Sequence, residues 1–323
     1  MSEKSALVGD IGGTNARFAL ADVSGGRPRI SDIREYPSKN YASGGDAVRA
    51  YLADVKAMPK VAAIAVAGPI TQGAVHFTNL GWTFTETELL GLGFQKSHLL
   101  NDFEALALAT QHFAPEELHL LGSTRDGQPD STVAVIGPGT GFGASALVRG
   151  RGHAIALAAE GGHASFAPCD EIEREILAVL ARKYDRVSIE RVLSGPGLLN
   201  LHGALNEIEG VKDDARLPAE ITERALKGEA LCARTVRRFV LILGSVAGDF
   251  ALIYGARGGV FIAGGISPTV LALFNVDEFR ERFEGKGRFQ SYLAAIPTQV
   301  ILYGYAAFLG AADHARRLVK SIT

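Results

Sequence analysis

Short apolar runs alternate with longer stretches of helical periodicity along most of the chain. The apolar runs predict strands, of which the clearest cover residues 7–8, 61–67, 98–100, 133–136, 260–263 and 300–302. The longer stretches predict helices at residues 102–110, 171–184, 219–226, 230–253 and 306–320. Strands that alternate with helices in this way are typical of an α/β protein.

Near the N-terminus, two apolar strands are separated by a turn that is rich in glycine. Asp10 ends the first strand, Gly12 and Gly13 lie in the turn, and Thr14 follows them. Glycine has no Cβ to block a positive φ or the approach of a ligand, so backbone N–H groups can turn toward one point. Amides beside a carboxylate and a hydroxyl suit a phosphate group with a hydrated Mg²⁺ ion. An ordinary Gly-Gly hairpin explains this segment equally well when it is taken alone.

The same arrangement occurs a second time, with a strand at residues 132–136, a Gly/Thr turn at 137–143 and a strand at 144–148. The polar and glycine positions of this turn are Gly137, Gly139, Thr140 and Gly141. Two such hairpins suggest two similar halves, each with a loop aimed at a shared cleft. Residues 110–130, which carry several Gly and Pro, are the expected crossing between the halves.

A third glycine cluster follows a predicted strand, where Gly264 and Gly265 precede Ser267 and Pro268. Ser267 is a good N-cap and Pro268 a good first residue of a helix, so a flat ring can pass across the glycines near a positive helix end. No Walker-type Gly-x-x-x-x-Gly-Lys-Ser/Thr sequence occurs, and Phe142 stands where a dinucleotide fingerprint requires glycine. A P-loop or Rossmann nucleotide site is therefore not expected.

The composition narrows the possible function classes. The 323 residues are 47% apolar, which is enough for a large core and for two domains. The net charge of −2 provides no basic field for nucleic acid or an anionic membrane. Neither a membrane-length apolar run nor a secretion signal is evident, so we expect a cytoplasmic protein. Cys169 and Cys232 are far apart in sequence, and we expect two free, buried thiols.

Together, the three glycine clusters resemble, in their order and spacing, those of the sugar kinase/Hsp70/actin superfamily. There the two hairpins are the phosphate 1 and phosphate 2 segments, and the strand with Gly-Gly is the adenosine segment. The resemblance implies an α/β, ribonuclease H-like fold of two domains with a cleft between them. It assigns residues 1–110 and 301–323 to a small domain and residues 111–300 to a large one.

Asn101 and Asp102 stand at the end of a predicted strand, just before a helix. Asn101 with Glu104 matches a capping box, and this local explanation is sufficient for the pair. A kinase of the implied kind also needs a carboxylate that accepts the proton of the attacking hydroxyl. Capping and catalysis do not exclude each other, so Asp102 is the candidate base.

Two further segments carry polar groups suited to a sugar. Glu160 and His163 flank two glycines; the carboxylate can accept hydroxyl protons, and the imidazole can donate or accept one more. A lone His is more often a satisfied interior residue than a ligand, and we expect no metal here. Ser188 is predicted to cap a short helix with Glu190 in its first turn, where a glutamate is favoured by the helix dipole alone.

The motifs Asp-Ile-Gly-Gly-Thr-Asn-Ala-Arg, Asn-Asp-Phe, Gly-Pro-Gly-Thr-Gly-Phe-Gly, Glu-Gly-Gly-His, Glu-Arg-Val-Leu-Ser-Gly-Pro-Gly and Phe-Ile-Ala-Gly-Gly-Ile resemble those of bacterial ATP-dependent glucokinase over nearly the whole chain. No Cys-rich loop follows Glu-Gly-Gly-His, which is similar to the zinc-free branch. The resemblance also implies that the loop from Thr78 and Asn79 to Trp82 walls the sugar pocket.

The resemblance implies phosphorylation of D-glucose at its 6-hydroxyl (EC 2.7.1.2), with Asp102 as general base, and a homodimer. It implies glucose binding by Asn101, Asp102, Glu160, His163 and Glu190. It implies ATP binding by Gly9, Asp10, Ile11, Gly12, Gly13, Thr14, Gly137, Gly139, Thr140, Gly141, Gly264 and Gly265. Mg²⁺ would arrive with ATP and lie near Asp10, with no direct protein ligand.

Other interpretations remain open at this point. A kinase for another hexose or an amino-sugar fits the same motifs. A sugar-responsive regulator on this fold would carry a DNA-binding helix-turn-helix ahead of the first hairpin, where only eight residues stand before Gly9. A chaperone or filament ATPase of the superfamily would lack the Glu-Gly-Gly-His segment and the Asn-Asp pair.

Overall fold

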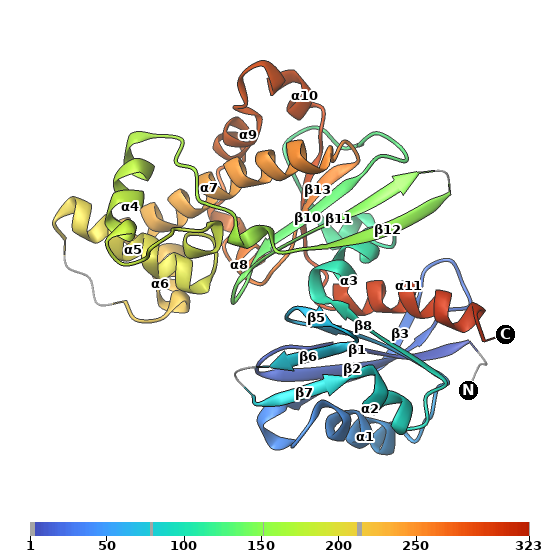
Figure 1. The fold of residues 1–323 in the computed structure, drawn as a ribbon. Helices are drawn as coiled ribbons and strands as arrows, with labels where there is room; N and C mark the ends of the chain where they lie inside the picture. Colours follow the sequence, from blue (N-terminus) through green and yellow to red (C-terminus); the bar gives the residue numbers. More distant parts are fainter. Residues whose placement is uncertain (1–3, 78–79, 151, 212–214, 323) are drawn as a thin grey trace. The chain divides into compact units, whose positions relative to one another are not determined.

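The computed structural model describes residues 4–77, 80–150, 152–211 and 215–322. It divides into two compact units, an N-terminal unit of Met1–Pro115 with Tyr303–Thr323 and a central unit of Glu116–Leu302. Each unit contains a β-sheet with helices packed on it (Figure 1), so the α/β architecture predicted from the alternation is confirmed. Within these described ranges, no helix is both long and apolar enough to cross a lipid bilayer.

The N-terminal unit is built on a sheet with the strand order β3-β2-β1-β4-β8, beside a small sheet of order β5-β6-β7. Its elements are β1 (Ser5–Ile11), β2 (Asn15–Asp22), β3 (Arg29–Pro37), α1 (Gly44–Val55), β4 (Val61–Val66), β5 (Ile70–Thr71), β6 (Ala74–Phe77), β7 (Trp82–Thr85), α2 (Glu86–Gly91), β8 (Lys96–Asn101), α3 (Asp102–Ala109) and α11 (Ala306–Lys320). Strand β4 has all its residues buried, because it lies between β1 and β8 and is parallel to both.

Small residues bring α3 and α11 together on one face of the larger sheet, and α1 and α2 lie on the other face (Figure 1). A Cβ added at Gly310 of α11 would stand 1.7 Å from the backbone oxygen of Ala105 in α3, so only glycine permits this approach. The opposite face packs Phe18, Tyr51 and Ile64, which are fully buried, into one apolar cluster. The predicted helix over residues 306–320 is present with the same bounds.

The central unit is built on a sheet with the strand order β12-β11-β10-β13-β14-β9. Its elements are β9 (Leu118–Leu121), β10 (Val133–Pro138), β11 (Phe142–Gly150), β12 (His153–Ala159), α4 (Glu171–Ala181), α5 (Gly195–Glu209), α6 (Pro218–Leu226), α7 (Ala230–Tyr254), β13 (Gly259–Ile262), α8 (Ile266–Thr269), α9 (Val276–Glu284), α10 (Gln290–Ala294) and β14 (Thr298–Ile301). The long helix α7 packs on β10 and β13, and α5, α6 and α9 pack around it. Its buried side chains, Phe239 among them, therefore form the centre of this core.

Candidate active site

The glycine hairpin predicted near the N-terminus is present. Strands β1 and β2 pair antiparallel as far as Ile11 and Ala16, which leaves Gly12, Gly13 and Thr14 in the turn. A Cβ at Gly12 would have only the Asn15 backbone oxygen within 4 Å, at 3.9 Å, and its φ is not left-handed. Room for a ligand, and not a special backbone conformation, is thus what glycine provides at this position.

Asp10 is the next-to-last residue of β1, its side chain is 32% exposed, and Arg17 Nη1 lies 4.0 Å from its Oδ2. Arg17 also donates through Nε to Glu35 Oε2 at 2.8 Å. Burial raises the pKa of Asp10, and the Arg17 charge acts in the opposite direction. An open carboxylate at the turn suits a hydrated Mg²⁺ ion, whose charge would offset that burial. Arg17 is not among the residues predicted from the sequence, although it stands directly opposite Asp10 in the hairpin register.

The N-cap predicted at the start of α3 is confirmed. Asn101 Oδ1 accepts from the N–H groups of Phe103 and Glu104 at 2.9 and 3.3 Å, which is the side-chain half of the capping box. Asp102 is the first residue of the helix, and its Oδ1 accepts from the Phe103 N–H at 2.9 Å. The half-buried Asp102 carboxylate is therefore oriented by the helix start itself.

The larger sheet of the N-terminal unit brings this pair toward the first hairpin. Ile11 pairs with Val66 across β1 and β4, and Val66 pairs with Asn101 across β4 and β8. Because these strands are parallel, Asp10 and Asp102 lie at the same edge of the sheet. Two strand spacings separate the backbones of Ile11 and Asn101, roughly 10 Å.

The second glycine hairpin is formed by β10 and β11, which pair antiparallel as far as Pro138 and Phe142. Its tip is closed by the Gly139 N–H, which donates to the Gly141 oxygen at 2.7 Å. A Cβ at Gly139 would meet no atom nearer than 4.0 Å, so the tip is open beside it. The tip residues Gly139, Thr140 and Gly141 are thus held by the sheet at the end of a buried strand.

The predicted adenosine segment follows β13, close to this hairpin. Gly264 has φ +84°, and a Cβ there would stand 2.1 Å from the Pro138 oxygen. A Cβ at Gly137 would stand 2.3 Å from the Ala263 oxygen, so glycine is required on both sides of the approach. The N-cap prediction for Ser267 is wrong. The chain turns at Gly264, α8 begins at Ile266 with Gly265 as N-cap, and Ser267 is fully buried inside the helix.

Glu160 and His163 are both exposed: Glu160 precedes a one-turn 3₁₀ helix at Gly161–His163, and His163 is its last residue. Their loop lies tightly on its own unit, because a Cβ at Gly162 would stand 2.2 Å from the Phe142 oxygen. The segment after His163 is bonded to the segment before Glu190, where the Ile189 N–H donates to the Ala164 oxygen at 2.8 Å. The structure therefore brings the loops of Glu160, His163 and Glu190 together.

The predicted short helix with Glu190 in its first turn is present, but the helix dipole alone does not explain Glu190. Ser188 precedes only a 3₁₀ turn, Ile189–Arg191, and its side chain makes no capping hydrogen bond. Glu190 instead accepts the Phe142 N–H on Oε2 at 2.9 Å, at the base of the second glycine hairpin. Ser194 is the N-cap of the next helix, α5. Its hydroxyl accepts from the Gly197 N–H at 2.9 Å and donates to the Glu190 backbone oxygen at 2.7 Å.

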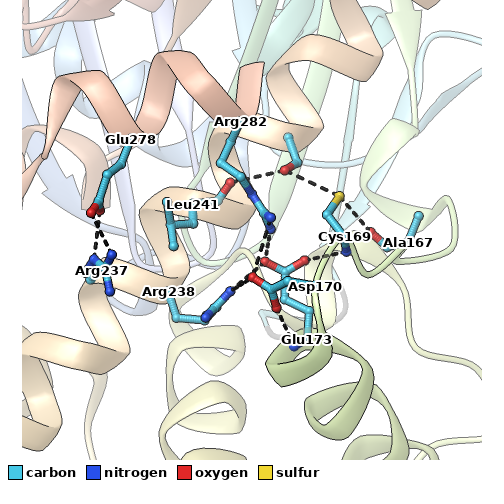
Figure 2. A network of polar contacts seen from close by, with 10 residues as sticks. Ala167, Cys169, Asp170, Glu173, Arg237, Arg238, Leu241, Glu278 and Arg282 are labelled. Atoms are coloured by element: carbon cyan, nitrogen blue, oxygen red, sulfur yellow. Dashed lines mark hydrogen bonds and ion pairs between the residues drawn. The ribbon is translucent and has the colours of Figure 1, made fainter. Parts of the chain in front are cut away.

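A network of largely buried charged side chains connects the segment that follows His163 to helices α7 and α9 (Figure 2). Asp170 caps α4, and the fully buried Glu173 accepts from the Cys169 N–H at 2.8 Å. Arg238 of α7 and Arg282 of α9 both donate to these carboxylates. Cys169 is exposed and not buried as expected, because it lies in the loop before α4, whereas Cys232 is buried within α7.

The predicted site residues thus fall into one group per unit. The N-terminal unit holds Gly9, Asp10, Ile11, Gly12, Gly13, Thr14, Asn101 and Asp102, and the central unit holds Gly137, Gly139, Thr140, Gly141, Glu160, His163, Glu190, Gly264 and Gly265. Thr78 and Asn79 of the expected pocket wall lie outside the described residues. Trp82 is buried in the core of the N-terminal unit, where its Nε1 donates to the Tyr41 oxygen at 3.2 Å.

Comparison with known proteins places this arrangement in a family. The glucokinase family profile matches residues 7–318. The chain belongs to the glucokinase family. A glucokinase from Caulobacter sp. (strain K31) is 50% identical over 309 residues, which cover 95% of this chain and 93% of that protein. A glucokinase from Hahella chejuensis is 43% identical over 311 residues, or 95% of this chain and 96% of that protein.

The family fold is also recognised among solved structures. The crystal structure of a glucokinase from an Antarctic psychrotroph matches with a TM-score of 0.89 and 37% identity, over 97% of this chain and 99% of that one. The family relationship confirms the two-domain sugar kinase fold and the glucokinase assignment that the motifs predicted.

Proposed function

We propose that this chain transfers the γ-phosphoryl group of ATP to the 6-hydroxyl of D-glucose (EC 2.7.1.2). The family match over residues 7–318 supports the reaction class. The observation that carries the assignment of roles is the shared sheet edge of Asp10 and Asp102, since a phosphate site and a base are needed side by side. In-line transfer needs little covalent chemistry from the protein, so positioning and charge supply the rate.

Asp102 is the proposed general base. Its carboxylate is oriented by the Phe103 N–H at the start of α3, and Asn101 fixes the same turn through its cap. A base so placed accepts the proton of the 6-hydroxyl as that oxygen attacks, which contributes about 10²–10⁴ in rate. Asn101 is proposed to bind a neighbouring hydroxyl of the same sugar.

The ATP phosphates are proposed to bind at the tips of the two glycine hairpins, and the adenosine to lie across Gly264 and Gly265. The open space beside Gly12 and Gly139 gives a phosphate group room to approach the two hairpin tips. Asp10 would hold Mg²⁺ through water, and the ion would supply positive charge to the phosphate oxygens.

Glu160, His163 and Glu190 are proposed to bind the remaining sugar hydroxyls. Their loops are bonded to one another in the central unit, and the charge network at Glu173 fixes one end of that assembly. A deoxy or epimeric sugar would leave these polar groups unpaired, so the site should discriminate strongly. We assign no metal to His163 and expect purified protein to contain no stoichiometric zinc by metal analysis.

Glucose must meet groups of both units if Asp102 and Glu190 act on one sugar molecule. We therefore propose that the units close on the sugar, which would also keep water from competing as acceptor. We further propose a homodimer, and a cytoplasmic location because ATP is the phosphoryl donor.

Identification of the product tests the proposed reaction. Purified protein is incubated with glucose, Mg²⁺ and ATP, and the product is examined by ³¹P and ¹H NMR. Glucose 6-phosphate with stoichiometric ADP is expected. Formation of glucose 1-phosphate, or ADP release without any phosphorylated sugar, would overturn the proposal.

A further inference from the structure

Glu190 is bonded to the second glycine hairpin over a long separation in sequence. Its Oε2 accepts the Phe142 N–H at 2.9 Å, across 48 positions of the chain. Phe142 is the first residue of β11, directly after the hairpin tip. The carboxylate therefore holds the base of the loop to which the proposed function assigns the ATP phosphates.

The Glu190 carboxylate lies close against the backbone of Gly141. A Cβ added at Gly141 would stand 2.5 Å from Glu190 Oε2 and 3.4 Å from its Cδ. A distance under 3.0 Å forces one group to move, so any side chain here would push Glu190 away from the Phe142 N–H. Glycine at this position therefore allows Glu190 to keep its bond to the Phe142 N–H.

The start of α5 is hydrogen-bonded both to the hairpin tip and to the backbone of Glu190. The Gly195 N–H donates to the Gly139 oxygen at 2.8 Å, and the Ser194 hydroxyl donates to the Glu190 backbone oxygen at 2.7 Å. The hairpin tip and the backbone of Glu190 are therefore tied to one rigid helix start. The Glu190 side chain is half-buried. Because the hairpin tip and the Glu190 backbone are both hydrogen-bonded to the start of α5, the side chain is the part of this contact that can move.

We propose that Glu190 couples sugar binding to nucleotide binding within the central unit. One carboxylate oxygen receives a sugar hydroxyl while the other keeps the Phe142 N–H, so both ligands favour the same position of one side chain. The inference rests on the proposed function, which assigns Glu190 to the sugar and this hairpin to the phosphates. It makes Glu190 a positioning residue for the hairpin in addition to a sugar ligand.

The sign of the coupling follows from the shared side chain. A ligand that favours the hairpin-bound position of Glu190 removes the cost of reaching that position for the second ligand. Glucose should therefore tighten nucleotide binding, and by thermodynamic reciprocity the nucleotide should tighten glucose binding by the same factor. Coupling of this kind typically amounts to at least about fivefold in affinity.

The test is calorimetric titration of the full chain with Mg²⁺ and AMP-PNP, which does not transfer its phosphoryl group. The dissociation constant is measured with and without saturating glucose for wild type, Glu190→Gln, Gly141→Ala and Gly203→Ala. Gly141→Ala displaces the carboxylate without removing it. Gly203→Ala adds the same methyl group within α5, where a Cβ has no atom within 4 Å. Thermal unfolding shows whether each variant is folded.

Wild type and Gly203→Ala should show coupling of about fivefold or more, and Gly141→Ala should show nearly none. Glu190→Gln should show a weakened factor, and it decides the matter if Gly141→Ala does not fold. Equal coupling in wild type and Gly141→Ala, or in wild type and Glu190→Gln if Gly141→Ala does not fold, would overturn the inference and leave the glucokinase reaction intact. No glucose binding or phosphorylation by wild type would instead overturn the proposed function.

Discussion

Asp102 combines two roles at the first residue of α3, as a part of the helix start and as the proposed base. Its Oδ1 accepts from the Phe103 N–H at 2.9 Å, and an amide oxygen can do the same. Asp102→Asn should therefore fold normally and bind glucose, while kcat falls by at least about a hundredfold. Steady-state kinetics and calorimetry of glucose binding measure the two effects separately.

The neighbouring carboxylate of Glu104 provides a matched control. It lies in the same first turn, where burial raises its pKa. Its backbone N–H donates to Asn101 Oδ1, so Glu104→Gln leaves that bond in place and should change kcat by less than about threefold. A near-normal kcat in Asp102→Asn would remove Asp102 from the catalytic assignment.

The residues that sequence reasoning placed correctly are those whose partners are local. Asn101 caps α3 as predicted, because the Glu104 N–H that its side chain accepts is only three positions away. The hydrogen bond of Glu190 was not predicted, because its partner, Phe142, is 48 positions away and no local pattern signals the contact. The N-cap prediction for Ser267 and the burial prediction for Cys169 are wrong for a related reason. The start of α8 and the exposure of Cys169 both depend on how a turn or loop packs on its unit.

At the scale of single elements, α4 begins with two glutamates in very different surroundings. The Glu173 side chain is fully buried between Arg238 and Arg282, whereas the Glu171 side chain is 72% exposed beside Arg174. Removing the charge from Glu173 leaves Asp170 as the remaining carboxylate for two largely buried arginines, at a cost of about 3 kcal/mol or more in unfolding free energy. The exposed pair contributes much less, because water and salt screen its charges.

The paired variants Glu173→Gln and Glu171→Gln test this difference by urea unfolding. Glu173→Gln should lower the unfolding free energy by several times more than Glu171→Gln does. Because the network fixes the loop that follows His163, Glu173→Gln should also raise the KM for glucose more than that for ATP. Similar stability losses in the two variants would contradict the structural role of the network.

Helix α11 contributes a histidine that should make the stability of the N-terminal unit depend on pH. The His314 ring stacks on His98 of β8, with 4.5 Å between ring centroids and 14° between ring planes. Burial, with nearby His98 and Arg317, lowers the pKa of His314 from 6.5 to about 4. The unfolded chain therefore binds a proton between these two pH values that the folded unit does not.

The His314 contribution is fully present above pH 6.5 and is lost as the pH falls toward 4. His314→Gln removes the titrating ring and should flatten the dependence of unfolding free energy on pH in that window. The slope should fall by up to about 1.4 kcal/mol per pH unit. An unchanged slope in the variant would show that His314 titrates normally in the folded chain.

The strands and helices themselves were predictable to within a few residues, because their apolar periodicity is a local property. The predicted helix at residues 230–253 is Ala230–Tyr254, and the predicted strand at 61–67 is Val61–Val66. Helix α5 was not predicted, because its start at Gly195 is rich in glycine and carries Pro196. The cap on Ser194 and the packing on α7 determine that helix instead.

At the scale of the whole molecule, the proposed closure on glucose makes a physical prediction. Asp102 belongs to the N-terminal unit and Glu190 to the central unit, so one sugar that binds both should draw the units together. Small-angle scattering should show a smaller radius of gyration with glucose than without it. ATP hydrolysis without sugar should be far slower than transfer, and an unchanged radius together with equal hydrolysis would contradict closure.

The central claim is that the chain is a glucose kinase whose polar groups match the hydroxyls of glucose. A coupled ADP-release assay across glucose, galactose, fructose and N-acetylated hexosamines, with ATP as donor, tests it most directly. Each unpaired buried polar group costs about 1–3 kcal/mol, so kcat/KM for glucose should exceed that for galactose and fructose by at least about tenfold. A higher kcat/KM for fructose or an N-acetylated hexosamine would contradict the assignment and leave only a hexose kinase of another specificity.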